Sequence, residues 1–119
     1  MAPIILFVDD HLDDAEMIAL LLRSTGYCVV TVETASETLV RAQDTVFDLY
    51  LLADKNGIEL CQQIRAFDTT TPILIFSAYA NQNQKRAALV AGAQDCVTQT
   101  DFDGLANKIA DCILMTQTY

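Results

Sequence analysis

Five short, mostly apolar segments, each followed by a segment with helical periodicity, constrain the fold of this chain more than any other feature. The apolar segments lie at 4–8, 28–32, 48–53, 73–76 and 95–97. Short apolar runs between turn signals indicate buried strands. Because strands alternate with helices five times, the pattern predicts an α/β fold: a parallel sheet with right-handed crossovers and helices on both faces.

The helical segments carry their own start and stop signals. Gly26 predicts a left-handed end for the first helix, and Thr34 and Glu37 have the spacing of a capping box that opens the second. In the fourth helical segment, large apolar side chains are few, and Leu89 and Val90 are the expected anchors to the sheet. These signals support the same alternating architecture.

Composition limits the classes of protein to which the chain can belong. Its 119 residues, 52% hydrophobic and 19% charged, fit one globular domain spanning 1–119. No apolar stretch is long enough to span a membrane, and the N-terminus lacks the basic start of a signal peptide, so we expect a cytoplasmic protein without membrane association. The net charge of −9 repels nucleic acid, and we expect none to bind this domain.

The cysteines argue against a disulfide or zinc framework. They are widely spaced, form no CxxC pair, and each falls within a predicted strand or helix. We therefore expect them to be small, reduced core residues. They are Cys28, Cys61, Cys96 and Cys112.

Polar side chains follow three predicted strands at their carboxyl ends: Asp9 and Asp10, then Asp54, then Ser77. Parallel strands bring these ends to one edge of the sheet, where ligands bind in open α/β folds. Neighbouring carboxylates repel, and Mg²⁺ would offset this and leave positions for phosphate oxygens. An aspartate can also act as a nucleophile toward phosphorus. The alternative is that Asp9 or Asp10 merely caps the next helix, and that His11 beside them is a surface residue and not a phosphotransfer histidine.

Five sequence segments in a fixed order carry a resemblance to a known family. They are ILFVDD at 5–10, FDLYLL at 47–52, NGIELCQQIR at 56–65, PILIFSAYA at 72–80 and AGAQDCVTQTDF at 91–102. Over about 4–114 the chain resembles the receiver domain of two-component response regulators. The resemblance implies a flavodoxin-like, three-layer fold whose five-stranded parallel sheet has the order 2-1-3-4-5.

The resemblance also implies a function and partners. A receiver domain works in phosphorelay signal transduction and is not itself an enzyme, and its partner is a histidine kinase or another signalling protein. In relatives, the fourth helix, the fifth strand and the fifth helix form the face for partners and for homodimers. We expect that face to be the first place where this chain binds a partner.

The site residues of the family carry over unevenly. The acid pair that holds Mg²⁺ in relatives matches Asp9 and Asp10, and the hydroxyl that contacts the phosphoryl group matches Ser77. The phosphoacceptor position, however, falls on Ala53. Asp54 is the next residue, and it can serve as acceptor and metal ligand only if the end of the strand shifts by one residue or bulges.

Three further departures concern the same mechanism. The lysine that pairs with the phosphoryl group in relatives falls on Gln99, the proline after it on Thr100, and the aromatic residue of the last strand on Cys96. An amide cannot replace an ammonium as counter-ion, and Lys55 is expected to be a solvated loop residue. The chain is therefore interpreted as a degenerate or pseudo-receiver, a signalling and protein-interaction module with impaired phosphorylation. The alternatives are a phosphorylatable receiver that uses Asp54 with Mg²⁺ and, more remotely, a flavodoxin-like binder of nucleotide or flavin.

Overall fold

The computed structural model describes residues 2–78 and 80–117, and in these ranges strands and helices alternate five times. The strands are β1 (Ile4–Val8), β2 (Cys28–Val32), β3 (Leu49–Leu52), β4 (Ile73–Ser77) and β5 (Asp95–Thr98). The helices are α1 (Leu12–Ser24), α2 (Ala35–Asp44), α3 (Gly57–Arg65), α4 (Gln82–Ala91) and α5 (Phe102–Gln117). Among them, no helix is both long and apolar enough to cross a membrane.

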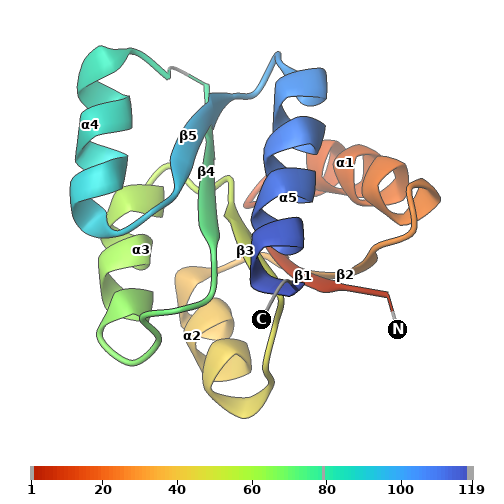
Figure 1. Cartoon of the computed structure of the whole chain (residues 1–119), viewed down its shortest axis with the longest axis horizontal. Helices are drawn as coiled ribbons and strands as arrows, with labels where there is room; N and C mark the ends of the chain where they lie inside the picture. The colour runs from red at the N-terminus through yellow and green to blue at the C-terminus, as the bar shows by residue number, and fades with distance from the viewer. Residues whose placement is uncertain (1, 79, 118–119) are drawn as a thin grey trace.

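The five strands form one parallel sheet in the order β2-β1-β3-β4-β5 (Figure 1). Strand β1 pairs with β2 on one side and with β3 on the other, and β4 joins β3 to β5. The predicted flavodoxin-like fold with the order 2-1-3-4-5 is thus confirmed. All five strands end at the same edge, which is where a site must lie in such a sheet.

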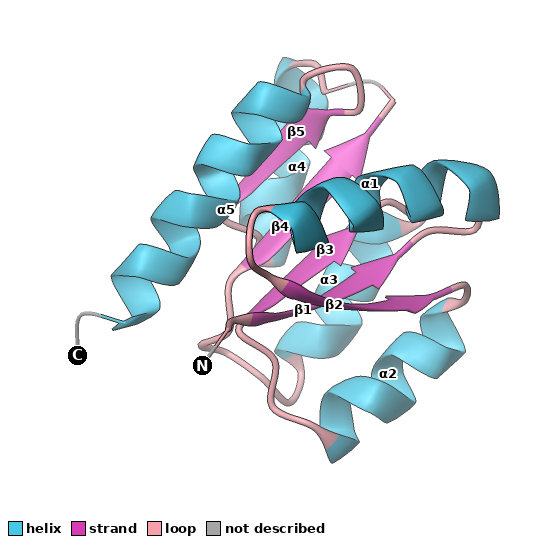
Figure 2. Cartoon of the chain, turned by 90° about the vertical axis from the view of Figure 1, so that its right-hand side faces the viewer, coloured by secondary structure: helices cyan, strands magenta, loops and turns pink. Residues whose placement is uncertain are grey.

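Helices cover both faces of the sheet and make the fold a three-layer sandwich (Figure 2). Alternate residues of each strand point to opposite faces. On one face Phe7 and Leu51 pack against α1 and α5, and on the other Leu6 and Leu52 pack against α2, α3 and α4. Because both faces are covered, β1 and β3 are apolar over nearly their whole length, as the sequence pattern predicted.

The two helix signals are confirmed, but the anchors of α4 were predicted wrongly. The hydroxyl of Thr34 accepts a hydrogen bond from the Glu37 amide at 3.1 Å, and Gly26 has a φ of 105° after α1. In α4, however, Leu89 and Val90 are 56% and 81% exposed, while Ala88 and Ala91 are buried. The helix packs through its smallest side chains, and its two large apolar residues face solvent.

The cysteines are free thiols, and three of them lie in the core as predicted. Burial raises the pKa of the Cys61, Cys96 and Cys112 thiols, so they remain protonated and unreactive at neutral pH. Cys28 is the exception and is exposed, because it begins the edge strand β2.

Candidate functional site

A cavity of about 850 Å³ lies at the carboxyl ends of the strands. Residues that follow β1, β3 and β5 line it, together with the last residue of β4. It brings together every site residue that the sequence predicted, and these are Asp9, Asp10, Asp54 and Ser77. The parallel topology causes this convergence, because it directs the end of every strand toward one edge.

The acid pair combines one buried and one exposed carboxylate. Asp9 is only 6% exposed, and its amide donates to the Val32 carbonyl at 3.1 Å, so its backbone continues the β1–β2 ladder. Its Oδ1 accepts a hydrogen bond from the His11 amide at 2.9 Å. Asp9 therefore holds the turn that leads into α1 and also borders the cavity. The N-cap residue of α1 is His11, whose side chain makes no capping hydrogen bond, so the alternative in which Asp9 or Asp10 caps this helix is wrong. Asp10, one residue further on, is exposed.

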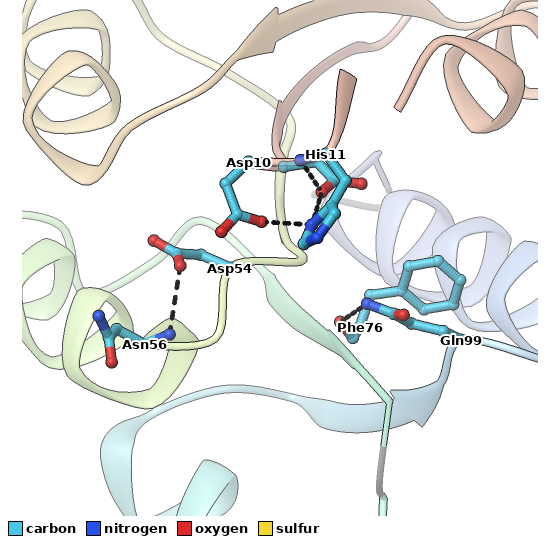
Figure 3. A network of polar contacts seen from close by, with 7 residues as sticks. Asp10, His11, Asp54, Asn56, Phe76 and Gln99 are labelled. Carbon is cyan, nitrogen blue, oxygen red and sulfur yellow. Dashed lines mark hydrogen bonds and ion pairs between the residues drawn. The ribbon is translucent and has the colours of Figure 1, made fainter. Parts of the chain in front are cut away.

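The imidazole of His11 lies against both acids. Its Nδ1 is 2.8 Å from Oδ1 of Asp10 (Figure 3). It is also 3.8 Å from Oδ1 of Asp9. One donor atom from each of the three side chains lies within 4.8 Å of the others. The ring is 74% exposed, as expected for a surface residue. The contact with the acids was not predicted, although three successive polar residues at a strand end could have suggested it.

The end of β3 does not shift. Val8 pairs with Leu52, and the Ala53 amide donates to the Val8 carbonyl at 2.8 Å, so Ala53 follows in register beside Asp9. Ala53 is 7% exposed; it belongs to the core beneath α1 and α5 and also lines the cavity. Asp54 could occupy the acceptor position only if the end of β3 shifted by one residue or bulged. The strand keeps its register, so Ala53 and not Asp54 lies at that position.

Asp54 reaches the cavity by a different route, through the turn that connects β3 to α3. Its carbonyl accepts from the Gly57 amide at 3.0 Å, and its Oδ1 accepts from the Asn56 amide at 3.3 Å. Figure 3 shows the carboxylate of Asp10 directed toward Asp54. Asp54 is half-buried and lines the same cavity, but it is not part of the group whose donor atoms lie within 4.8 Å of one another.

The wall formed by β4 and β5 holds Ser77 and Gln99. Ser77 is half-buried and pairs with Thr98. The backbone N–H of Gln99 donates to the Ser77 carbonyl at 2.8 Å. The side-chain Nε2 of Gln99 donates to the Phe76 carbonyl at 3.2 Å (Figure 3). The side chain of Gln99 thus fastens β5 to β4. Among the described residues that line the cavity, Lys55 alone carries a permanent positive charge, and it is exposed.

Comparisons with known proteins agree on one family. The family model described as "Response regulator receiver domain" matches residues 5–110. The chain is 32% identical over 118 residues to the transcriptional regulatory protein ZraR of Klebsiella oxytoca, which covers 95% of this chain and 27% of that protein. It is 36% identical over 110 residues to the response regulator ArlR of Staphylococcus epidermidis, covering 88% of this chain and 50% of that protein. The chain thus spans between about a quarter and a half of these relatives.

Solved structures show the same fold. The receiver domain of the Francisella response regulator 1452 superposes with a TM-score of 0.90 at 22% identity, covering 97% of this chain and 99% of that one. The response regulator TrrA of Thermotoga maritima, solved in complex with Mg²⁺-BeF, superposes with a TM-score of 0.82 at 26% identity, covering 94% and 99%. The similarity therefore extends over almost the whole length of both chains.

Proposed function

Because the chain belongs to the response regulator receiver domain family, we propose that residues 1–119 form a single receiver domain that acts as a signalling and protein-interaction module with impaired phosphorylation. The observation that carries this proposal is the position of Ala53. It lies in register beside Asp9, at the position where relatives have the phosphoacceptor, and it contributes only a buried methyl group. A methyl group cannot accept a phosphoryl group, and we assign the chain no enzymatic activity of its own.

The environment of Gln99 supports the same proposal. In relatives this position holds a lysine that pairs with the phosphoryl group. Here the side-chain Nε2 donates to the Phe76 carbonyl and carries no formal charge, so it supplies no counter-ion to the cavity. Of the cavity residues that the structure describes, Lys55 is the remaining one with a permanent positive charge, and it is exposed in the loop after Asp54.

The donor set at the cavity fits Mg²⁺, and we propose Asp9 and Asp10 as its ligands, with Asp54 as a further candidate. Mg²⁺ binds through one or two carboxylates and keeps several waters, which suits one buried and one exposed carboxylate at an open cavity. The structure of TrrA, which contains Mg²⁺-BeF, is consistent with such a site in this fold. When bound, the ion would neutralise the acids and attract phosphate oxygens, with Ser77 as the hydroxyl that contacts them.

We further propose that a histidine kinase or another signalling protein is the partner, and that α4, β5 and α5 form the contact face. Leu89 and Val90 of α4 are 56% and 81% exposed, and Leu114 of α5 is 63% exposed. Apolar side chains of this size lose contact with water when a partner or a second copy covers them. The same face is the proposed homodimer surface.

Sedimentation velocity over a range of concentrations tests the homodimer. The wild-type chain should show a reversible dimer that Val90→Glu weakens. Val46→Glu is the matched control, because Val46 is 88% exposed but lies in the loop between α2 and β3, away from the proposed face. A dimer that both variants weaken equally, or no dimer at all, would exclude this face as a self-association surface.

A second candidate function is a phosphorylatable receiver with Asp54 as acceptor. It is favoured by one observation: Asp54 lines the cavity that also contains the acid pair and Ser77. In this alternative the turn after β3, and not the strand, would present the carboxylate to phosphorus.

Intact mass measurement after incubation with acetyl phosphate and Mg²⁺ separates the two candidates. Under the main proposal, the wild-type chain gains no phosphoryl mass, and the double variant Ala53→Asp, Gln99→Lys gains one. If the wild-type chain gains a phosphoryl group that Asp54→Asn abolishes, Asp54 is the acceptor and phosphorylation is not impaired. The double variant is the positive control, because it restores the acceptor and the counter-ion of the family.

A further inference from the structure

We propose that His11 turns the acid pair into a three-ligand site that binds a first-row transition ion, such as Zn²⁺, more tightly than Mg²⁺. This inference rests on the metal site proposed above and adds a nitrogen ligand that changes which ion the site selects. It depends on three side chains that are consecutive in the chain, Asp9, Asp10 and His11.

The donor atoms already lie near the spacing of metal ligands. Metal bonds of about 2.1 Å at angles of about 90–110° place neighbouring donors about 3.0–3.4 Å apart. Nδ1 of His11 is 2.8 Å from Oδ1 of Asp10 and 3.8 Å from Oδ1 of Asp9. The three donors lie within 4.8 Å of one another, and rotations of the exposed Asp10 and His11 side chains about their own torsions would bring them onto one ion.

Within the described part of the chain, the imidazole makes its polar contacts with the side chains with which it would share the ion, because its Nδ1 hydrogen-bonds Oδ1 of Asp10, and a bound ion would replace that contact. His11 is the N-cap residue of α1, but its side chain makes no capping hydrogen bond. The backbone amide of His11, and not its ring, binds Asp9. The ring is 74% exposed and borders the cavity, so an ion can reach it from solvent. The Asp9 carboxylate, only 8% exposed, holds the inner side of the site in place.

The chemistry of the donors determines the preferred ion. Imidazole nitrogen is a good ligand for Zn²⁺, Cu²⁺ and Ni²⁺, whereas Mg²⁺ prefers oxygen donors and keeps its waters. Two carboxylates alone suit Mg²⁺. The same two carboxylates with one imidazole form a donor set typical of transition ions, which the open cavity leaves accessible to water as a further ligand.

Calorimetric titration with Zn²⁺ and separately with Mg²⁺ tests the proposal. Cys28→Ser is the starting chain, because Cys28 is the exposed thiol and would bind Zn²⁺ on its own. Replacing even an outer partner of a metal ligand costs about 10–100-fold in affinity. We therefore expect His11→Ala to weaken Zn²⁺ binding by about tenfold or more and to leave Mg²⁺ binding within about twofold. Asp10→Asn should weaken the binding of both ions.

Nitrogen-15 NMR of the imidazole provides a readout that does not depend on affinity. The chain contains one histidine, so in tag-free protein the ring signals can only come from His11. Saturating Zn²⁺ should shift the Nδ1 resonance, and saturating Mg²⁺ should not. If Mg²⁺ binds but His11→Ala leaves Zn²⁺ affinity unchanged, or Nδ1 does not respond, the role of His11 is wrong while the acid pair stands. If neither ion binds, the acid-pair site itself is wrong.

Discussion

Replacing Tyr50 with phenylalanine should destabilise the fold, although it changes the volume of the core very little. Tyr50 is 1% exposed, and its hydroxyl donates to Oδ2 of Asp68 at 3.1 Å. The same carboxylate also accepts from the Thr71 hydroxyl at 2.7 Å and from the amides of Thr70 and Thr71 at 3.1 and 3.0 Å. Asp68 thus connects the middle strand β3 to the loop that precedes β4.

The size of the effect follows from the geometry. Burial, then the charge of Asp68 and its hydrogen bond, raises the pKa of Tyr50, so the phenol remains a neutral donor at pH 7. A hydrogen bond to a charged group contributes about 1.5–3 kcal/mol. Because Asp68 is only half-buried and keeps three other donors, we expect the lower end for Tyr50→Phe, about 1.5 kcal/mol. Asp68→Ala removes the acceptor for all four donors and should cost about 2–4 kcal/mol.

Urea unfolding followed by circular dichroism measures these differences. With a slope of about 1–3 kcal/mol per molar urea, Tyr50→Phe should lower the midpoint by about 0.5–1.5 M without changing the slope. Tyr27→Phe is the matched control, because Tyr27 is half-buried and its hydroxyl makes no hydrogen bond within the described residues. The double variant Tyr50→Phe, Asp68→Ala completes the cycle, and its coupling energy should be about 1 kcal/mol.

Two results would refute this reasoning. Equal midpoints for Tyr50→Phe and Tyr27→Phe would mean that the phenol–carboxylate contact adds no stability. A coupling energy near zero would mean that any loss in Tyr50→Phe arises from packing and not from the hydrogen bond to Asp68.

Three further predictions concern other parts of the chain. Burial alone would raise the pKa of Asp68, but hydrogen bonds from Thr71 and its neighbours lower it. The ionised Asp68 therefore contributes its full stability to the fold above the unfolded pKa of about 4, and this contribution is lost as pH falls through the lower folded pKa. The urea midpoints of the wild-type chain and Asp68→Asn should accordingly converge in acid. Gly92→Ala should lower the melting temperature more than Gly26→Ala. Both glycines have a positive φ, but only at Gly92 would the new Cβ lie 2.8 Å from the Arg65 side chain. Equal losses of melting temperature would contradict this. The melting temperature of the wild-type chain should rise across millimolar Mg²⁺, and a flat response would argue against a metal site.

The fold could be predicted from the sequence because its signal is repeated many times. Alternating apolar and helical segments recur five times, and each repeat independently indicates a parallel crossover. The same logic brought Asp9, Asp10, Asp54 and Ser77 to one edge, and all four line one cavity. No side-chain detail was needed for that prediction, only the direction of the strands.

The packing of α4 could not be predicted in the same way. Hydrophobicity favours Leu89 and Val90 as anchors, but Ala88 and Ala91 are the buried residues. Alanine carries little hydrophobic signal, and it is buried here because the helix lies close to its neighbours. Gly92 and Arg65 illustrate this closeness, since even a single added methyl group at Gly92 would collide with the arginine.

The sequence by itself determined the order of the elements and the set of polar groups at the carboxyl edge of the sheet. The tertiary structure decided how those groups are presented: Ala53 remains in register, Asp54 enters through a turn, Gln99 bonds to a main-chain carbonyl and His11 contacts the acids. The physical reason is a difference in scale. Strand and helix patterns average over many residues, whereas the direction of one side chain at a strand end depends on a few backbone hydrogen bonds that no periodicity encodes.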